Sequence, residues 1–202
     1  MGAAAPVAGL ATAWDTRRVR DPTALPDDLP VPEDDGAADH LPGTRLPAIA
    51  LPATDGSTVT LAELPGTNVV FAYPRTGRPG EEPPGGEEDW NAIPGARGCT
   101  PEACSFRDER ARFEERGARV FGLSTQDSDY QREAVERLHL PYAILSDEQL
   151  ELTRALDLPT FTVDGMTLIR RITLIVRAGV IDDVVYPVFP PDRGAELALE
   201  RL

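Results

Sequence analysis

The stretch that decides the fold is residues 95–109, GARGCTPEACSFRDE, which contains both cysteines of the chain, Cys99 and Cys104. It begins with a glycine-rich segment and continues with a helical pattern. Thr100 is a good N-cap residue, and Pro101 then takes the first helical position, where a missing N–H costs nothing. We therefore expect Cys99 at or just before a helix N-terminus and Cys104 more than one turn inside the helix.

This placement has consequences for both thiols. The unpaired backbone N–H groups and partial positive charge of a helix N-terminus favour the thiolate, which is the nucleophilic form. Five helical residues rise by about 7.5 Å and turn by about 140°, whereas a disulfide needs Cα atoms within about 7 Å. The sequence therefore predicts two states, a helical dithiol and an unwound disulfide.

The cysteine pair by itself also fits other interpretations. Free cysteines are often small buried side chains without a chemical role. A metal site is disfavoured because four intervening residues is not the common zinc spacing and no histidine lies nearby. A static disulfide would be unusual in a protein without an export signal. We expect neither a metal nor a cofactor.

Composition narrows the function classes. The 202 residues fit one domain with a substantial core. There are 34 acidic and 20 basic side chains, a net charge of −14, so phosphate-rich nucleic acid would be repelled. No apolar run reaches membrane-spanning length. Because the first residues, MGAAAPVAGLATA, carry no charge, a secretory n-region is missing and we expect a cytoplasmic protein.

Two regions stand apart from the periodic sequence. Residues 1–44 hold six prolines and eight acidic residues and are interpreted as an extended arm, either flexible or packed on the body, ahead of a domain at 45–202. Residues 75–98 contain ten Gly or Pro among 24 residues, which predicts a long inserted loop without a core that borders Cys99. Within it, Trp90 and Ile93 either anchor the loop or form a wall near the reactive site.

The rest of the chain alternates between strand and helix patterns. This alternation, closed by an antiparallel hairpin, predicts an α/β three-layer sandwich with a central mixed β-sheet. A cysteine at the start of a helix after a central strand makes the thioredoxin-like fold the best match. The expected elements are a hairpin at 46–64, strands at 68–73, 118–124, 142–145, 171–176 and 180–186, and helices at 100–117, 127–139, 146–156 and from 191 or 192 onward.

The run from Gly98 to Asp108, GCTPEACSFRD, closely resembles the active-site motif of the peroxiredoxin Q, or bacterioferritin comigratory protein, family. A weaker resemblance extends from about residue 46 to about residue 190. It implies an atypical two-cysteine peroxidase. Cys99 would attack hydrogen peroxide or an organic hydroperoxide, Cys104 would resolve the sulfenic acid as a disulfide, and a thioredoxin-like reductant would recycle the enzyme.

The resemblance also suggests further site residues. The family places an arginine at the start of a strand, and Arg171 in RITLI fits; the adjacent Arg170 faces the opposite way. The family has a Thr or Ser three residues before the reactive cysteine, where this chain has Ala96. Because Pro74 resembles the family proline, with the long loop inserted after it, we expect Thr76 to supply the missing hydroxyl.

Two more family positions and two rival functions complete the expectations. Glu102 and Arg107 are interpreted as structural, Glu102 as a first-turn residue and Arg107 as an ion-pair partner. One rival is a thioredoxin-like thiol–disulfide oxidoreductase, although its C-x-x-C motif is absent. The other is a redox sensor, in which unwinding changes partner binding. The sequence leaves monomer and homodimer open.

Overall fold

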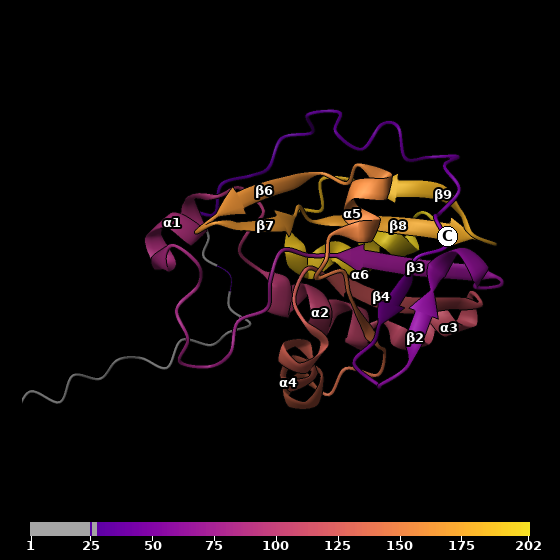
Figure 1. Cartoon of the computed structure of the whole chain (residues 1–202), viewed down its shortest axis with the longest axis horizontal. Helices are drawn as coiled ribbons and strands as arrows, with labels where there is room; N and C mark the ends of the chain where they lie inside the picture. Colours follow the sequence, from indigo (N-terminus) through magenta and orange to yellow (C-terminus); the bar gives the residue numbers. More distant parts are fainter. Residues whose placement is uncertain (1–24, 26–27) are drawn as a thin grey trace, which may run out of the picture.

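The computed structural model describes residue 25 and residues 28–202 (Figure 1). Most of the arm expected at 1–44 therefore lies outside the described residues. A five-stranded sheet forms the centre, in the order β5-β4-β3-β8-β9. Its strands are β3 (Thr67–Ala72), β4 (Ala118–Ser124), β5 (Ile144–Ser146), β8 (Ile172–Arg177) and β9 (Val180–Val185).

The central strand β3 carries the mixed topology. It pairs in parallel with β4, where Val70 lies opposite Phe121, and antiparallel with β8, where Val70 lies opposite Leu174. The side chains of Val69 and Phe71 point to one face and that of Val70 to the other, and all are buried because both faces are covered. The predicted mixed sheet is confirmed.

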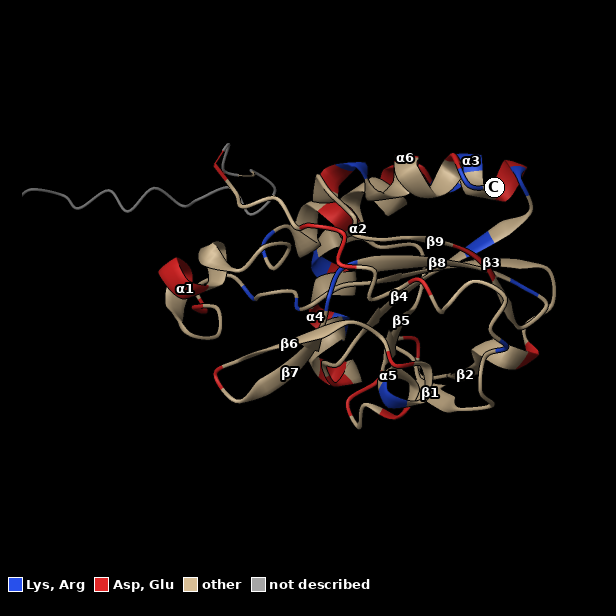
Figure 2. Cartoon of the chain, turned by 90° about the horizontal axis from the view of Figure 1, so that it is seen from above, with Lys and Arg blue, Asp and Glu red and all other residues tan. Residues whose placement is uncertain are grey.

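Two layers cover the sheet (Figure 2). Helices α2 (Cys99–Asp108), α3 (Arg110–Glu115) and α6 (Gly194–Leu199) pack on one face, where Phe106, Phe113 and Ala198 share an apolar cluster with Phe71. The other face carries α5 (Glu151–Leu156) and the hairpin of β1 (Ala50–Pro52) and β2 (Thr58–Thr60). Helix α4 (Ser128–Leu138) packs beside β5 at the sheet edge. The predicted three-layer sandwich is thereby confirmed.

A second hairpin, which the sequence analysis did not predict, precedes β8. Strands β6 (Thr160–Val163) and β7 (Met166–Ile169) pair antiparallel. Asp164 and Gly165 connect them with φ values of 49° and 73°, the positive pair that a tight two-residue hairpin turn requires.

The region 75–98 differs from the predicted coreless loop. It contains helix α1 (Gly86–Ala92), and Trp90 is only 5% exposed. Trp90 packs with Ala96 and with Leu168 of β7, and its ring centroid lies 6.3 Å from that of Phe161. The missed hairpin supplies the apolar partners that this region lacks, so Trp90 acts as the anchor that was one of the two interpretations.

One helix begins later than predicted. Ser146 ends β5 instead of capping a helix, and α5 begins at Glu151. The carboxylate of Asp147 accepts the backbone N–H groups of Leu152 (3.0 Å) and Thr153 (2.8 Å). The first-turn donors are therefore satisfied by the residue after the predicted cap.

The packed body begins before residue 45. Ala38 and Leu41 are buried in the core. The backbone N–H of Gly43 donates to the carbonyl of Ile181 at 2.7 Å, so this part of the chain runs along β9 (Figure 1, indigo trace). No helix within the described part of the chain is long and apolar enough to cross a membrane.

Candidate active site

Helix α2 begins two residues earlier than predicted, with Cys99 as its first residue and Gly98 as its N-cap. Gly98 has a φ of 108°, and a Cβ there would lie 2.4 Å from Cγ of Pro191, so the position requires glycine. Thr100 and Pro101 lie in the first turn, where the backbone N–H groups have no helical partner and proline is tolerated. Cys99 therefore lies at the positive helix end, as predicted.

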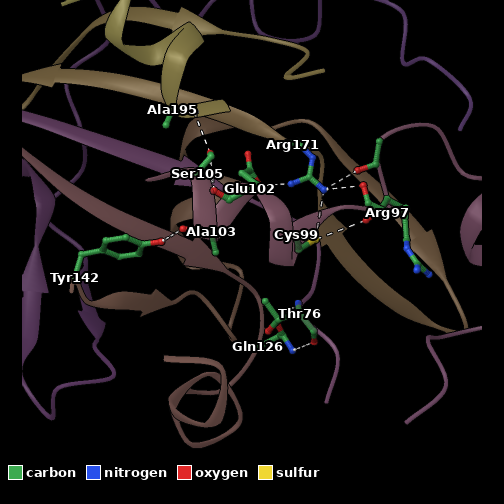
Figure 3. A network of polar contacts seen from close by, with 12 residues as sticks. Thr76, Arg97, Cys99, Glu102, Ala103, Ser105, Gln126, Tyr142, Arg171 and Ala195 are labelled. Carbon is green, nitrogen blue, oxygen red and sulfur yellow. Dashed lines mark hydrogen bonds and ion pairs between the residues drawn. The ribbon is translucent and has the colours of Figure 1, made fainter. Parts of the chain in front are cut away.

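Cys99 is buried, with 4% of its surface exposed. The structure places Arg171 beside it as expected, with Nη2 at 3.4 Å from Sγ (Figure 3). In the thiol form Sγ donates to the carbonyl of Ala96 at 3.6 Å. The backbone N–H of Arg75 also stabilises the sulfur as an anion. The sulfur thus faces one fixed cation and one backbone donor.

The guanidinium of Arg171 is held from several sides. Its Nη1 forms a buried ion pair with Glu102, and its Nη2 donates to the carbonyls of Gly95 and Arg97, each at 3.2 Å (Figure 3). The adjacent Arg170 instead donates to the carbonyl of Thr160. Sequence reasoning treated Glu102 only as a first-turn residue; its contact with an arginine 69 positions away could not be read from local sequence.

Two acidic groups, the Cys99 thiol and the Glu102 carboxyl, interact with the single positive charge of Arg171. Burial raises the pKa of the Cys99 thiol, and the Arg171 guanidinium opposes that rise. Burial likewise raises the pKa of Glu102 to about 7, again against Arg171. Because a carboxylate at Glu102 also raises the pKa of Cys99, protonation of Glu102 releases the charge of Arg171 to stabilise the thiolate.

Cys104 lies inside α2 and is partly buried. Both cysteines are free thiols, as the geometric argument predicts for an intact helix. The predicted ion-pair role of Arg107 is seen in its 2.8 Å contact with Asp108, and its Nη1 also donates to the carbonyl of Leu138.

Polar contacts hold the first turns of α2. Tyr142 donates its hydroxyl to the carbonyl of Ala103 at 2.7 Å, and Ser105 donates to the carbonyl of Glu102 at 2.8 Å (Figure 3). The backbone N–H of Ala195 in turn donates to Oγ of Ser105 at 3.3 Å. Together with the Glu102–Arg171 ion pair and the burial of Ala103 in the core, these bonds join the turn between the two cysteines to its surroundings.

The side chain of Phe106, the residue after Ser105, is held by aromatic packing instead of hydrogen bonds. Phe106 stacks on Phe71 of β3, with ring centroids 4.2 Å apart and planes at 8°, and its centroid lies 5.6 Å from that of Phe113. Such aromatic pairs contribute about 0.5–1.5 kcal/mol beyond the burial of their area. Helix α2 is therefore firmly anchored from Phe106 onward.

The expected hydroxyl, Thr76, is buried but directed elsewhere. Its hydroxyl donates to Oε1 of Gln126 at 3.2 Å, and Nε2 of Gln126 donates back to the Thr76 carbonyl at 3.0 Å (Figure 3). A hydroxyl has one proton to donate, so this arrangement does not aim it at Cys99. Among the described residues, no hydrogen bond joins the Thr76 hydroxyl to the sulfur, and a catalytic role for Thr76 stays a prediction.

No group of three or more metal-ligating side chains occurs in the described part of the chain. The sequence analysis did not predict the hydrogen bonds between Gln126 and Thr76. The signal of Gln126 was weak, because a single glutamine after a strand is a common surface residue.

The redoxin family matches residues 41–199. The chain belongs to this family. Its relatives include a chloroplastic peroxiredoxin Q of Suaeda salsa, 30% identical over 160 residues, which cover 79% of this chain and 66% of the relative. Peroxiredoxin bcp1 of Schizosaccharomyces pombe is 29% identical over 153 residues, covering 74% of this chain and 69% of the relative. The chain thus spans about two thirds of these proteins.

Solved structures agree with the fold. Peroxidoxin BcpB from Mycobacterium tuberculosis superimposes with a TM-score of 0.63 at 26% identity, covering 80% of this redoxin and 96% of that chain. A peroxiredoxin Q mutant of Xylella fastidiosa superimposes with a TM-score of 0.63 at 20% identity, covering 80% of this chain and 95% of that chain. At this identity the likeness supports the fold alone. The predicted family resemblance and thioredoxin-like fold are confirmed.

Proposed function

We propose that this redoxin is a thiol-dependent peroxidase acting on hydrogen peroxide and organic hydroperoxides. The observation that carries the proposal is the 3.4 Å contact between Cys99 Sγ, at the first residue of α2, and Nη2 of the buried Arg171. A nucleophile activated by a helix N-terminus and a fixed cation is the arrangement that displacement at a peroxide oxygen needs.

In the first step the Cys99 thiolate attacks the terminal oxygen of ROOH. The S–O bond forms as the O–O bond breaks, Cys99 becomes the sulfenic acid S–OH, and RO⁻ leaves and takes a proton from water. Arg171 stabilises the negative charge that moves from sulfur toward the leaving oxygen, because it is already in place and need not reorient. Glu102 and the carbonyls of Gly95 and Arg97 hold the guanidinium in that position.

In the second step the Cys104 thiolate attacks the sulfur of the sulfenic acid, and hydroxide leaves as the disulfide forms. The first turns of α2 must unwind for this attack, because the intact helix keeps the two sulfurs apart. The hydrogen bonds at Ala103 and Ser105 are among the contacts that must break. A cytoplasmic dithiol protein of the thioredoxin class then reduces the disulfide by exchange.

Steady-state peroxide consumption coupled to thioredoxin, thioredoxin reductase and NADPH tests the proposal. Cys99→Ser should abolish turnover, whereas Cys104→Ser should still form the sulfenic acid once but fail to turn over with thioredoxin. Full activity in Cys99→Ser would contradict the proposal. Stoichiometric oxidation of the unaltered protein without turnover would favour a sensor.

A further inference from the structure

The chain segment before the first strand lies against the backbone just ahead of the reactive cysteine. A Cβ placed on Gly98 would be 3.2 Å from Cδ2 of Leu25, and one placed on Gly95 would be 3.8 Å from Cβ and Cγ of Pro32. These two glycines flank the loop whose carbonyl groups hold Arg171. The segment is tethered there, because Tyr186 donates its hydroxyl to Oδ1 of Asp35 at 3.0 Å.

Pro32 lines the narrow opening that leads to the catalytic arginine, Arg171. A crevice of about 10 Å³ reaches Arg171 and is also lined by Arg170; its other walls are apolar or aromatic. This is about the smallest volume that holds one water molecule. Pro32 forms one wall of the crevice, and the others include Pro94, Gly95, Tyr186 and Pro187.

We infer that Pro32 is a specificity-determining residue that restricts this redoxin to small hydroperoxides, with hydrogen peroxide preferred over those with aryl or branched alkyl groups. The inference rests on the proposed peroxidase function and selects within its substrate class. A peroxide must place its terminal oxygen beside Cys99 Sγ and Arg171 Nη2, which are 3.4 Å apart. The atoms attached to the other oxygen then extend into the crevice, where the Pro32 side chain forms one wall.

The test compares the kcat/KM for cumene hydroperoxide with that for hydrogen peroxide. In Pro32→Ala the ratio should rise by about tenfold, the lower range for size discrimination by an apolar pocket. The matched control is Val31→Ala, because Val31 belongs to the same segment but is 64% exposed; its ratio should equal that of the unaltered protein. An unchanged ratio in Pro32→Ala, or an equal rise in the control, would overturn the inference.

A second measurement needs no peroxide. In a Cys104→Ser background, Cys99 is the only thiol, and its alkylation by iodoacetamide is compared with that by a bulky N-aryl maleimide. Pro32→Ala should accelerate the maleimide reaction selectively, and equal acceleration of both reagents would count against a steric wall. If no hydroperoxide is turned over but this reagent selectivity appears, the proposed peroxidase function is wrong, whereas the steric restriction by Pro32 is confirmed. If hydrogen peroxide is reduced without this selectivity, the inference alone fails.

Discussion

Removing the charge of Arg171 should show how much of the reactivity of Cys99 it provides. Its Nη2 lies 3.4 Å from the sulfur, and at an effective dielectric constant of about 20 this corresponds to at most about 5 kcal/mol. The charge is spread over the guanidinium and shared with Glu102, so the smaller range of about 1–3 pKa units, typical of an adjacent opposite charge, applies. Arg171→Met should therefore raise the pKa of Cys99 by this amount and lower the thiolate fraction at neutral pH about tenfold per unit.

The assay follows the rate of Cys99 alkylation by iodoacetamide against pH in a Cys104→Ser background. The rate rises with pH as the thiol ionises, and the midpoint should move to higher pH in Arg171→Met. Arg171→Met combined with Glu102→Gln avoids leaving a buried carboxyl group without its partner, which would destabilise the fold. Arg170→Met is the matched control, because Arg170 donates to the Thr160 carbonyl and not to the sulfur. An unchanged or lower midpoint in the Arg171 variants would refute the electrostatic reasoning.

Four further outcomes are expected. Oxidation to the disulfide should raise amide hydrogen exchange at residues 99–105 but not beyond Phe106; equal exchange in both redox states would remove the unwinding step. Glu102 keeps its proton up to about pH 7 in the folded chain but only to about its ordinary value of 4.5 when unfolded, so its stabilising effect is complete below pH 4.5 and is lost as the pH rises through 7. Urea unfolding of Glu102→Gln should lack this pH slope, and retention of the slope would place its origin elsewhere. Trp90→Ala should lower the free energy of unfolding by about 3–5 kcal/mol, as for other buried aromatic truncations; a loss well under about 1 kcal/mol, the scale of a surface change, would show that the 75–98 region unfolds separately. Thr76→Val should slow sulfenic acid formation through the lost contact with Gln126 while the fold persists, and an unchanged rate would remove Thr76 from the mechanism.

Much of the fold could be predicted because its signals are local. The apolar run of β3 and the helical pattern after Cys99 each lie within about a dozen residues, and their periods differ. The β6–β7 hairpin was missed although Asp164-Gly165, between TFTV and MTLI, is a turn signal between alternating runs. The core of the 75–98 region was missed for the same reason, since its partners belong to that hairpin.

The candidate site was predictable only as far as motifs reach. Cys99, Cys104 and Arg171 were identified from short patterns, and the structure places Arg171 against Cys99. The start of α2 was misplaced because Thr100 is a good N-cap residue, whereas in the structure the N-cap is Gly98, which lies against Pro191. The bonds of Thr76 to Gln126, and of Glu102 to Arg171, join positions 50 and 69 residues apart. No local pattern encodes such pairings.

The stacking of Phe106 on Phe71 has a consequence for repeated turnover. Unwinding that ends at Phe106 breaks hydrogen bonds of α2 but leaves the aromatic layer of the core closed. The heat capacity of a protein responds mainly to the apolar surface that water reaches, so the dithiol and the disulfide should differ in it only through small buried side chains of the unwound turn, such as Pro101 and Ala103. Each redox cycle would then proceed without exposing the large aromatic side chains of the core, whose exposure leads partly unfolded chains to aggregate.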